Sequence, residues 1–255
     1  MMSFDWPALA VLFFVGGAAS AINAVAGGGT LISFPILIGM GIPPIQANAT
    51  NAVGLWPGSV GGGLGFKDSL EPTKHYLKSL AVPTFLGALA GAGLLLITPA
   101  KLFNFLVPIL IVFASLVLFL QPRIKDWSQR PHVRLPEWTG AALQFGVAIY
   151  GGYFGAGMGI MMLAAYTLFM DATIHEMNAV KTWLGMIINL VASILFITQG
   201  LVLPIPGIVL ALGAIIGGFI AAKASLRADS EKLRLAIAGY GFFMAAYFVW
   251  KFFGP

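Results

Sequence analysis

The chain has 255 residues, of which 59% are apolar and 9% are charged, with a formal net charge of +5. An ordinary soluble domain is about 25% charged. At about 20 residues per membrane helix, this length holds roughly eight to ten segments and leaves no room for a soluble enzyme domain. The composition therefore predicts an all-α polytopic protein surrounded by a lipid bilayer. The sequence contains no cysteine, which excludes disulfides and thiol chemistry.

Apolar segments follow one another along the chain with short connections. Their expected bounds are 6–24, 30–43, 45–66, 79–97, 100–120, 136–156, 158–170, 174–198, 204–223 and 234–253. Segments 30–43 and 158–170 are too short to cross about 30 Å of hydrocarbon comfortably at about 1.5 Å per residue. We expect these two to be half-helices or re-entrant pieces. Thr173 and Glu176 have the spacing of a capping box, which predicts that a helix begins there.

Each short segment begins at or just after a glycine-rich run, and the two runs belong to a duplication. Residues 26–30 read Ala-Gly-Gly-Gly-Thr, and residues 156–160 read Ala-Gly-Met-Gly-Ile, at an offset of 130 residues. The same offset pairs Gly16 with Gly146, Asn48 with Asn178, and Phe66 with Phe196. We therefore predict two membrane repeats of about five segments each, one in residues 1–128 and one in residues 129–255.

The duplicated runs predict a binding site for a small anion. Irregular backbone survives at membrane depth only where it is buried or lines a cavity, and matching broken helices in two halves are typical of transporter binding sites. A helix N-terminus offers unsatisfied N–H groups and partial positive charge, and glycines let an anion approach them. We expect Gly27, Gly28 and Gly29 in the first copy, and Gly157 and Gly159 in the second, to contact the substrate.

Close helix packing is the alternative role for glycines in membrane helices. Gly87 and Gly91, like Gly213 and Gly217, are spaced four residues apart inside long apolar segments. We assign these four glycines to helix packing.

Basic residues gather in three connections. These are Lys67, Lys74 and Lys78, then Arg123, Lys125, Arg130 and Arg134, and finally Lys223, Arg227, Lys232 and Arg234. If every segment reverses the chain direction, all of them lie on one face, which the positive-inside rule makes cytoplasmic. An odd number of reversals per half makes the repeats inverted and places both termini on the non-cytoplasmic side. The positive charge then reflects membrane orientation, and we expect no nucleic-acid partner.

Three stretches carry a resemblance to a known family. The first reads Asn23-Ala-Val-Ala-Gly-Gly-Gly-Thr-Leu-Ile-Ser-Phe-Pro35, the second Ala47-Asn-Ala-Thr-Asn51, and the third joins Gly155-Ala-Gly-Met-Gly159 to Met177-Asn-Ala-Val-Lys181. Over nearly the whole chain the sequence resembles the sulfite exporter TauE/SafE family of anion permeases. The resemblance implies export or uptake of sulfite, organosulfonates or related small anions across a bacterial inner membrane.

Lys181 is the one basic residue well inside an apolar segment, and it stands where the first copy has Asn51. A charge inside a membrane is costly and usually faces a cavity or a partner. We therefore expect Lys181 to attract the anion; the alternatives are snorkelling to the surface or pairing with Glu176. The polar residues expected beside it in the site are Asn23, Thr30, Asn48, Asn51, Asn178, Thr182 and Tyr153. Each of these is alternatively a contact between helices or an interfacial aromatic residue.

The remaining chemistry is sparse. All nine acidic residues fall in connections or at segment ends, so no intramembrane carboxylate relay is visible. The sequence offers no metal-ligand spacing, no nucleotide motif and no nucleophile with a base, so we expect no cofactor, no metal and no enzymatic activity.

These observations predict a secondary transporter of small oxyanions, sulfite or an organosulfonate, that works by alternating access. The alternatives are an anion channel, a permease for a carboxylate or another inorganic anion, and, as a rival class, an intramembrane enzyme. The sequence leaves the exact anion, the direction, the coupling ion and the oligomeric state open.

Overall fold

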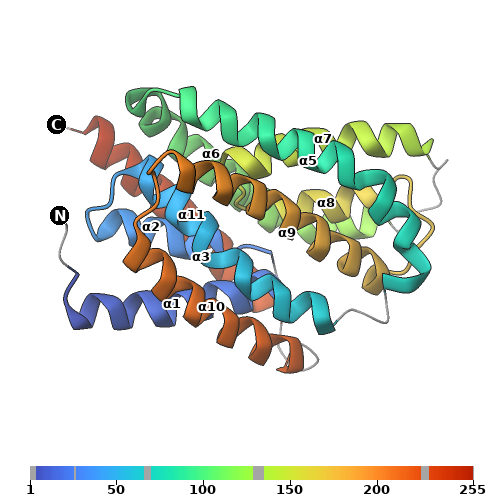
Figure 1. Ribbon diagram of the computed structural model, residues 1–255, viewed down its shortest axis with the longest axis horizontal. Helices are drawn as coiled ribbons and strands as arrows, with labels where there is room; N and C mark the ends of the chain where they lie inside the picture. Colours follow the sequence, from blue (N-terminus) through green and yellow to red (C-terminus); the bar gives the residue numbers. More distant parts are fainter. Residues whose placement is uncertain (1–3, 26, 66–69, 129–134, 225–229, 255) are drawn as a thin grey trace.

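The computed structural model describes residues 4–25, 27–65, 70–128, 135–224 and 230–254. Within these ranges the protein is helical and contains no strand (Figure 1). The helices are α1 (Trp6–Val25), α2 (Thr30–Gly39), α3 (Pro44–Gly65), the short 3-10 helix η1 (Glu71–Thr73), α5 (Lys74–Ile97), α6 (Ala100–Ser128), α7 (Glu137–Tyr153), α8 (Met158–Tyr166), α9 (Ile174–Thr198), α10 (Pro204–Ala224) and α11 (Ser230–Phe253). Each expected segment corresponds to one α-helix. Some residues named above lie outside the described ranges, namely Ala26, Phe66, Lys67, Arg130, Arg134 and Arg227.

Long apolar helices make up much of the described chain. The stretches that are long and apolar enough to span a membrane are Trp6–Ala24, Glu71–Ile97, Ala100–Arg123, Ile174–Thr198 and Glu231–Phe253. Large apolar side chains project outward from them, among them Phe14, which is 72% exposed, and Phe243, which is 67% exposed. Such exposure suits contact with lipid tails, so the fold is that of a multi-pass membrane protein.

The two short segments form short helices, as expected. Helix α2 has 10 residues and α8 has 9, so each is only about 14–15 Å long, half the thickness of the hydrocarbon core. The predicted capping box is confirmed at the start of α9, where Glu176 N donates to Thr173 Oγ1 and Thr173 N donates to Glu176 Oε2 at 2.6 Å. This reciprocal pair satisfies backbone donors that the helix itself leaves unpaired.

The helices pack into two units that each combine both parts of the sequence. Helices α1, α3 and α10 form the first unit, and α5, α7 and α9 form the second unit. Helices α6 and α11 pack against each other, and α3 meets α9 where the two units face each other. The short helix α2 lies on α1, α3 and α11, while α8 lies on α7, α9 and α6.

Glycines bring the backbones into contact inside each unit. A Cβ atom at Gly213 or Gly217 would overlap the backbone of α1, and a Cβ atom at Gly87 or Gly91 would overlap the backbone of α7. The packing role predicted for these four glycines is confirmed. Close backbone contact of this kind is how small residues join membrane helices.

The direction of the long helices follows from Figure 1 and from one contact. Helix α1 begins and α11 ends at the same end of the bundle, and α3 and α10 end at the opposite one (Figure 1). The connection after α9 lies beside the early part of α3, because Leu203 N donates to Thr50 Oγ1 at 3.0 Å. Helices α3 and α9 therefore cross the bundle in opposite directions.

Candidate functional site

The two glycine-rich runs break the helical path in the same way. Gly27 has a φ of +78° and Gly157 has a φ of +76°, a left-handed conformation that only glycine adopts at little cost. These residues are equivalent in the duplication. The two breaks also meet in space, because a Cβ atom at Gly27 would lie 3.1 Å from Ile160 Cγ1 at the start of α8.

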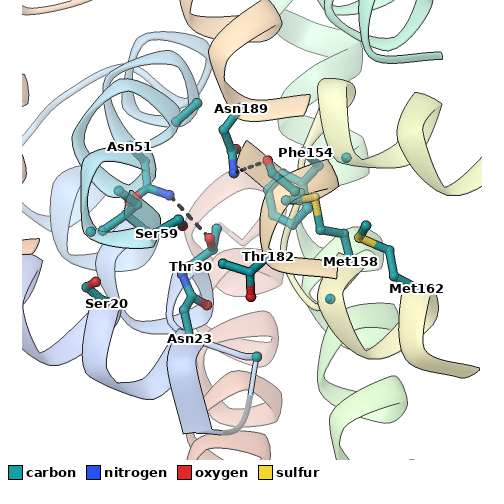
Figure 2. A pocket seen from close by; sticks show the side chains of 18 of the residues that line it. Ser20, Asn23, Thr30, Asn51, Ser59, Phe154, Met158, Met162, Thr182 and Asn189 are labelled. Atoms are coloured by element: carbon teal, nitrogen blue, oxygen red, sulfur yellow. Dashed lines mark hydrogen bonds between the residues drawn. The ribbon is translucent and has the colours of Figure 1, made fainter. Parts of the chain in front are cut away.

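A cavity of about 110 Å³ lies between the two units, lined by residues next to both breaks (Figure 2). A water molecule needs about 10–15 Å³ on the same scale, so the cavity has room for a small oxyanion. Figure 2 shows hydroxyl and amide side chains from α1, α2 and α3 on one side of it. Phe154, Met158 and Met162 provide an apolar surface on the other side.

Hydrogen bonds hold the polar wall in place. Asn23 Oδ1 accepts a hydrogen bond from Gly29 N at 2.7 Å, so one of the N–H groups at the start of α2 is already paired with a side chain. Because its oxygen is used, Asn23 has its NH2 group to offer a ligand. Asn51 Nδ2 donates to Thr30 Oγ1 at 3.4 Å, which leaves the Thr30 hydroxyl proton to be donated elsewhere.

Lys181 supplies the charge. Among the described residues that line the cavity, it is the only charged one. Its ammonium donates to Asn178 Oδ1 at 2.7 Å. Glu176, the acidic partner considered from the sequence, instead accepts hydrogen bonds from Thr173 N and Oγ1. The electrostatic character of the cavity is therefore cationic, which favours an anionic occupant.

Most of the side chains and glycines predicted for the site line this cavity. They are Asn23, Gly27, Thr30, Asn48, Asn51, Gly159, Lys181 and Thr182. They come from α1, the first break, α2, α3, α8 and α9, and the fold brings them together across more than 150 residues of sequence. Their role in binding a substrate stays a prediction.

Three predicted glycines lie outside the lining. A Cβ atom at Gly28 would meet Leu118 on α6, and one at Gly29 would overlap the backbone of Ala19 on α1. A Cβ atom at Gly157 would lie 3.5 Å from the Ala114 carbonyl oxygen on α6. These glycines let the breaks pack against neighbouring helices.

Tyr153 and Asn178 also lie outside the lining, and both form hydrogen bonds with other residues. The Tyr153 hydroxyl donates to Thr98 Oγ1 at 3.4 Å, and its carbonyl oxygen accepts from Asn48 Nδ2 at 2.9 Å. Asn178 Nδ2 donates to the Ile174 carbonyl oxygen at 2.9 Å. Tyr153 thus ties α7 to its neighbours, and Asn178 belongs to the surroundings of Lys181.

Several polar residues of the cavity were not predicted from the sequence, namely Ser20, Ser59 and Asn189. Ser59 and Asn189 are equivalent in the duplication, and each lies eight residues after Asn51 or Lys181. Positions i, i+4 and i+8 lie on one face of a helix. The helical period applied to both repeats would have found these two residues.

The chain is similar to known proteins over nearly its whole length. The pattern of the family described as "Sulfite exporter TauE/SafE" matches residues 12–248. The chain is 28% identical to a "Probable membrane transporter protein" of Haemophilus influenzae, over 95% of this chain and 94% of that protein. It is 28% identical to "Probable membrane transporter protein YfcA" of Escherichia coli strain K12, over 89% of this chain and 84% of that protein.

A third relative, "Probable membrane transporter protein ORF9" of a Sinorhizobium species, is 26% identical over 92% of this chain and 89% of its own length. No solved structure gives a significant match. Because the family pattern covers nearly the whole chain, the two short helices and the cavity between them lie within the matched region. The chain is a membrane protein of the sulfite exporter TauE/SafE family of transporters.

Proposed function

We propose that this protein is a secondary transporter that moves a small oxyanion, sulfite or an organosulfonate, across the bacterial inner membrane by alternating access. The observation that carries the proposal is the cavity between the two breaks, with Lys181 on its wall and hydroxyl and amide groups around it. A buried ammonium is stabilised by an anion, and hydroxyl and amide groups can donate to its oxygens. The family description names sulfite, and the relatives are named only as probable membrane transporters.

We infer that the two repeats are inverted, an arrangement found in many transporters that work by alternating access. Exchanging the five α-helices of one repeat with those of the other maps the α1–α10 contact onto α7–α5, the α3–α10 contact onto α9–α5, and the α2–α11 contact onto α8–α6. The equivalent helices α3 and α9 run in opposite directions, as repeats related by an axis in the membrane plane do. Gly27 and Gly157 share the left-handed conformation.

The packing suggests which parts move. Inside each unit the helices touch through backbone and glycine, whereas α3 of the first unit and α9 of the second meet beside the cavity and both contribute to its lining. We infer that the first and second units rock against each other around the cavity, so that it opens to one side of the membrane at a time. On this proposal the basic connections are cytoplasmic and both termini are outside the cytoplasm.

The experiment that tests the function is uptake by proteoliposomes containing the purified chain. The panel consists of sulfite, sulfate, methanesulfonate, taurine, acetate and chloride, each measured with and without a pH gradient. The proposal expects saturable uptake of sulfite or a sulfonate above empty liposomes. Uptake of acetate alone would favour a carboxylate permease, and uptake of none of the anions would contradict the proposal.

A further inference from the structure

The surroundings of Lys181 contain a second residue with a defined task. Asn178 lies one helical turn before Lys181 on α9, and both ends of its amide are engaged. Its Nδ2 donates to the Ile174 carbonyl oxygen at 2.9 Å, and its Oδ1 accepts from Lys181 Nζ at 2.7 Å. The reverse orientation would set the NH2 group against the ammonium and the oxygen against a carbonyl oxygen, so the two bonds together determine which end faces the lysine.

The methylene groups of the Lys181 side chain also have a defined contact. A Cβ atom at Gly159 would lie 3.4 Å from Lys181 Cδ and 3.9 Å from Cε. The lysine chain therefore lies over the first turn of α8, where the glycine leaves room for it. An ammonium group has three donors, and Asn178 uses one of them. Two donors are then left, and Lys181 itself is one of the residues that line the cavity.

The first repeat does not make the same contact. At the equivalent positions, Asn48 Nδ2 donates to the Tyr153 carbonyl oxygen at 2.9 Å, and Asn51 Nδ2 donates to Thr30 Oγ1 at 3.4 Å. The first repeat thus uses both amides to join helices, whereas the second uses Asn178 to hold a charge. This difference makes the site asymmetric although the backbone breaks are alike.

We propose that Asn178 is a positioning residue, which holds the Lys181 ammonium on the cavity wall so that its remaining N–H groups face the anion. This inference rests on the proposed function, in which Lys181 binds the substrate. Asn178 itself does not touch the substrate. Without the tether, the long lysine side chain regains rotamer freedom.

A double-mutant cycle tests the proposal, with sulfite binding to the purified chain measured by calorimetry. Asn178→Leu keeps the branched shape of the side chain and removes its hydrogen-bonding groups. We expect it to lower the affinity about 10-fold to 100-fold, the range for losing a hydrogen bond to a charged group. In the Lys181→Met background, Asn178→Leu should have no further effect, because the group that it positions is gone. Asn178→Asp should neutralise the ammonium and lower the affinity at least as much as Lys181→Met does.

Asn104→Leu is the matched control, because Asn104 is an amide on α6 outside the cavity lining with an unpartnered Oδ1. Its affinity should equal that of the wild type, and thermal unfolding of every variant reports folding. An unchanged affinity in Asn178→Leu, or an equal loss in both backgrounds, overturns the positioning role while the proposed function stands. Absence of sulfite and sulfonate binding to the wild type overturns both.

Discussion

At the scale of single residues, the site contains amides with different tasks. Asn23 accepts from Gly29 N and so caps α2, whereas Asn51 joins α3 to α2 through Thr30. From the sequence we expected the N–H groups of the break to bind the anion directly. One of those N–H groups already donates to Asn23, so on the proposed function the end of α2 offers an anion an amide side chain beside its remaining backbone N–H groups.

Asn23→Asp separates capping from anion binding. A carboxylate accepts from Gly29 N as well as an amide oxygen does and suits the positive end of a helix, so thermal stability should be unchanged or slightly higher. The added negative charge in the cavity should weaken binding of sulfite by about 1–3 kcal/mol, the size of a charged contact. Calorimetry and thermal unfolding on the same preparation check both values. Equal affinity for sulfite in the two proteins would remove Asn23 from the cavity's electrostatics.

At the scale of elements, the glycines of the breaks serve conformation and packing. Gly27 and Gly157 have positive φ angles, and Gly28 faces Leu118 on α6. The pattern of glycines predicted where the helices break, because glycine runs at matching places in two membrane repeats favour a broken helix over a continuous one. The glycine pattern did not predict which glycines face the cavity and which face a neighbouring helix. That depends on how α6 packs against the breaks, and α6 is distant in sequence.

Gly157→Ala should lower stability by about 1–2 kcal/mol, the cost of a left-handed conformation for a residue with a Cβ atom. The added methyl group would not clash with a neighbour, because the nearest atom to the Cβ position is 3.5 Å away. Gly146→Ala on α7 is the matched control, because no atom lies within 4 Å of that Cβ position; it should be neutral or stabilising. Thermal unfolding in detergent compares the two variants. Equal melting temperatures would contradict the conformational role of Gly157.

At the scale of the whole molecule, the order of helices in the sequence differs from their grouping in space. Each unit takes two helices from one repeat and one from the other. Hydropathy predicted the segments well, because a membrane helix is recognised from its own residues. The grouping of the helices in space could not be predicted from the sequence. It arises from backbone contacts such as that of Gly91 with Ile149, residues about 60 positions apart in the chain.

A disulfide inside the first unit tests which bodies move. Val53 on α3 and Gly207 on α10 are neighbours, because a Cβ atom at Gly207 would lie 3.8 Å from Val53 Cγ1, so side chains at the two positions face each other. The pair Val53→Cys and Gly207→Cys joins the two repeats within one unit. Uptake of sulfite should survive oxidation. Uptake that stops on oxidation and returns with reductant would mean that the repeats, and not the units, move.

Cysteine labelling tests the orientation of the molecule. Arg123→Cys at the end of α6 should react with a membrane-impermeant maleimide only from the cytoplasmic side, and Asp5→Cys before α1 only from the other side, because basic residues favour the cytoplasm. Both positions are exposed, and the chain has no native cysteine to interfere. Intact cells and inverted membrane vesicles provide the two sides. Labelling of both positions from the same side would contradict the proposed topology.

The proposed transport depends above all on the cavity beside Lys181 being the site through which the anion passes. Its sharpest test is the initial rate of sulfite uptake into proteoliposomes by the wild type, by Lys181→Met and by Lys251→Met, a control that removes an exposed lysine on α11. We predict that Lys181→Met weakens sulfite interaction by about 1–3 kcal/mol and reduces uptake at low sulfite about 10-fold or more, while Lys251→Met transports like the wild type. Equal rates for all three proteins at every sulfite concentration would contradict this role of the cavity.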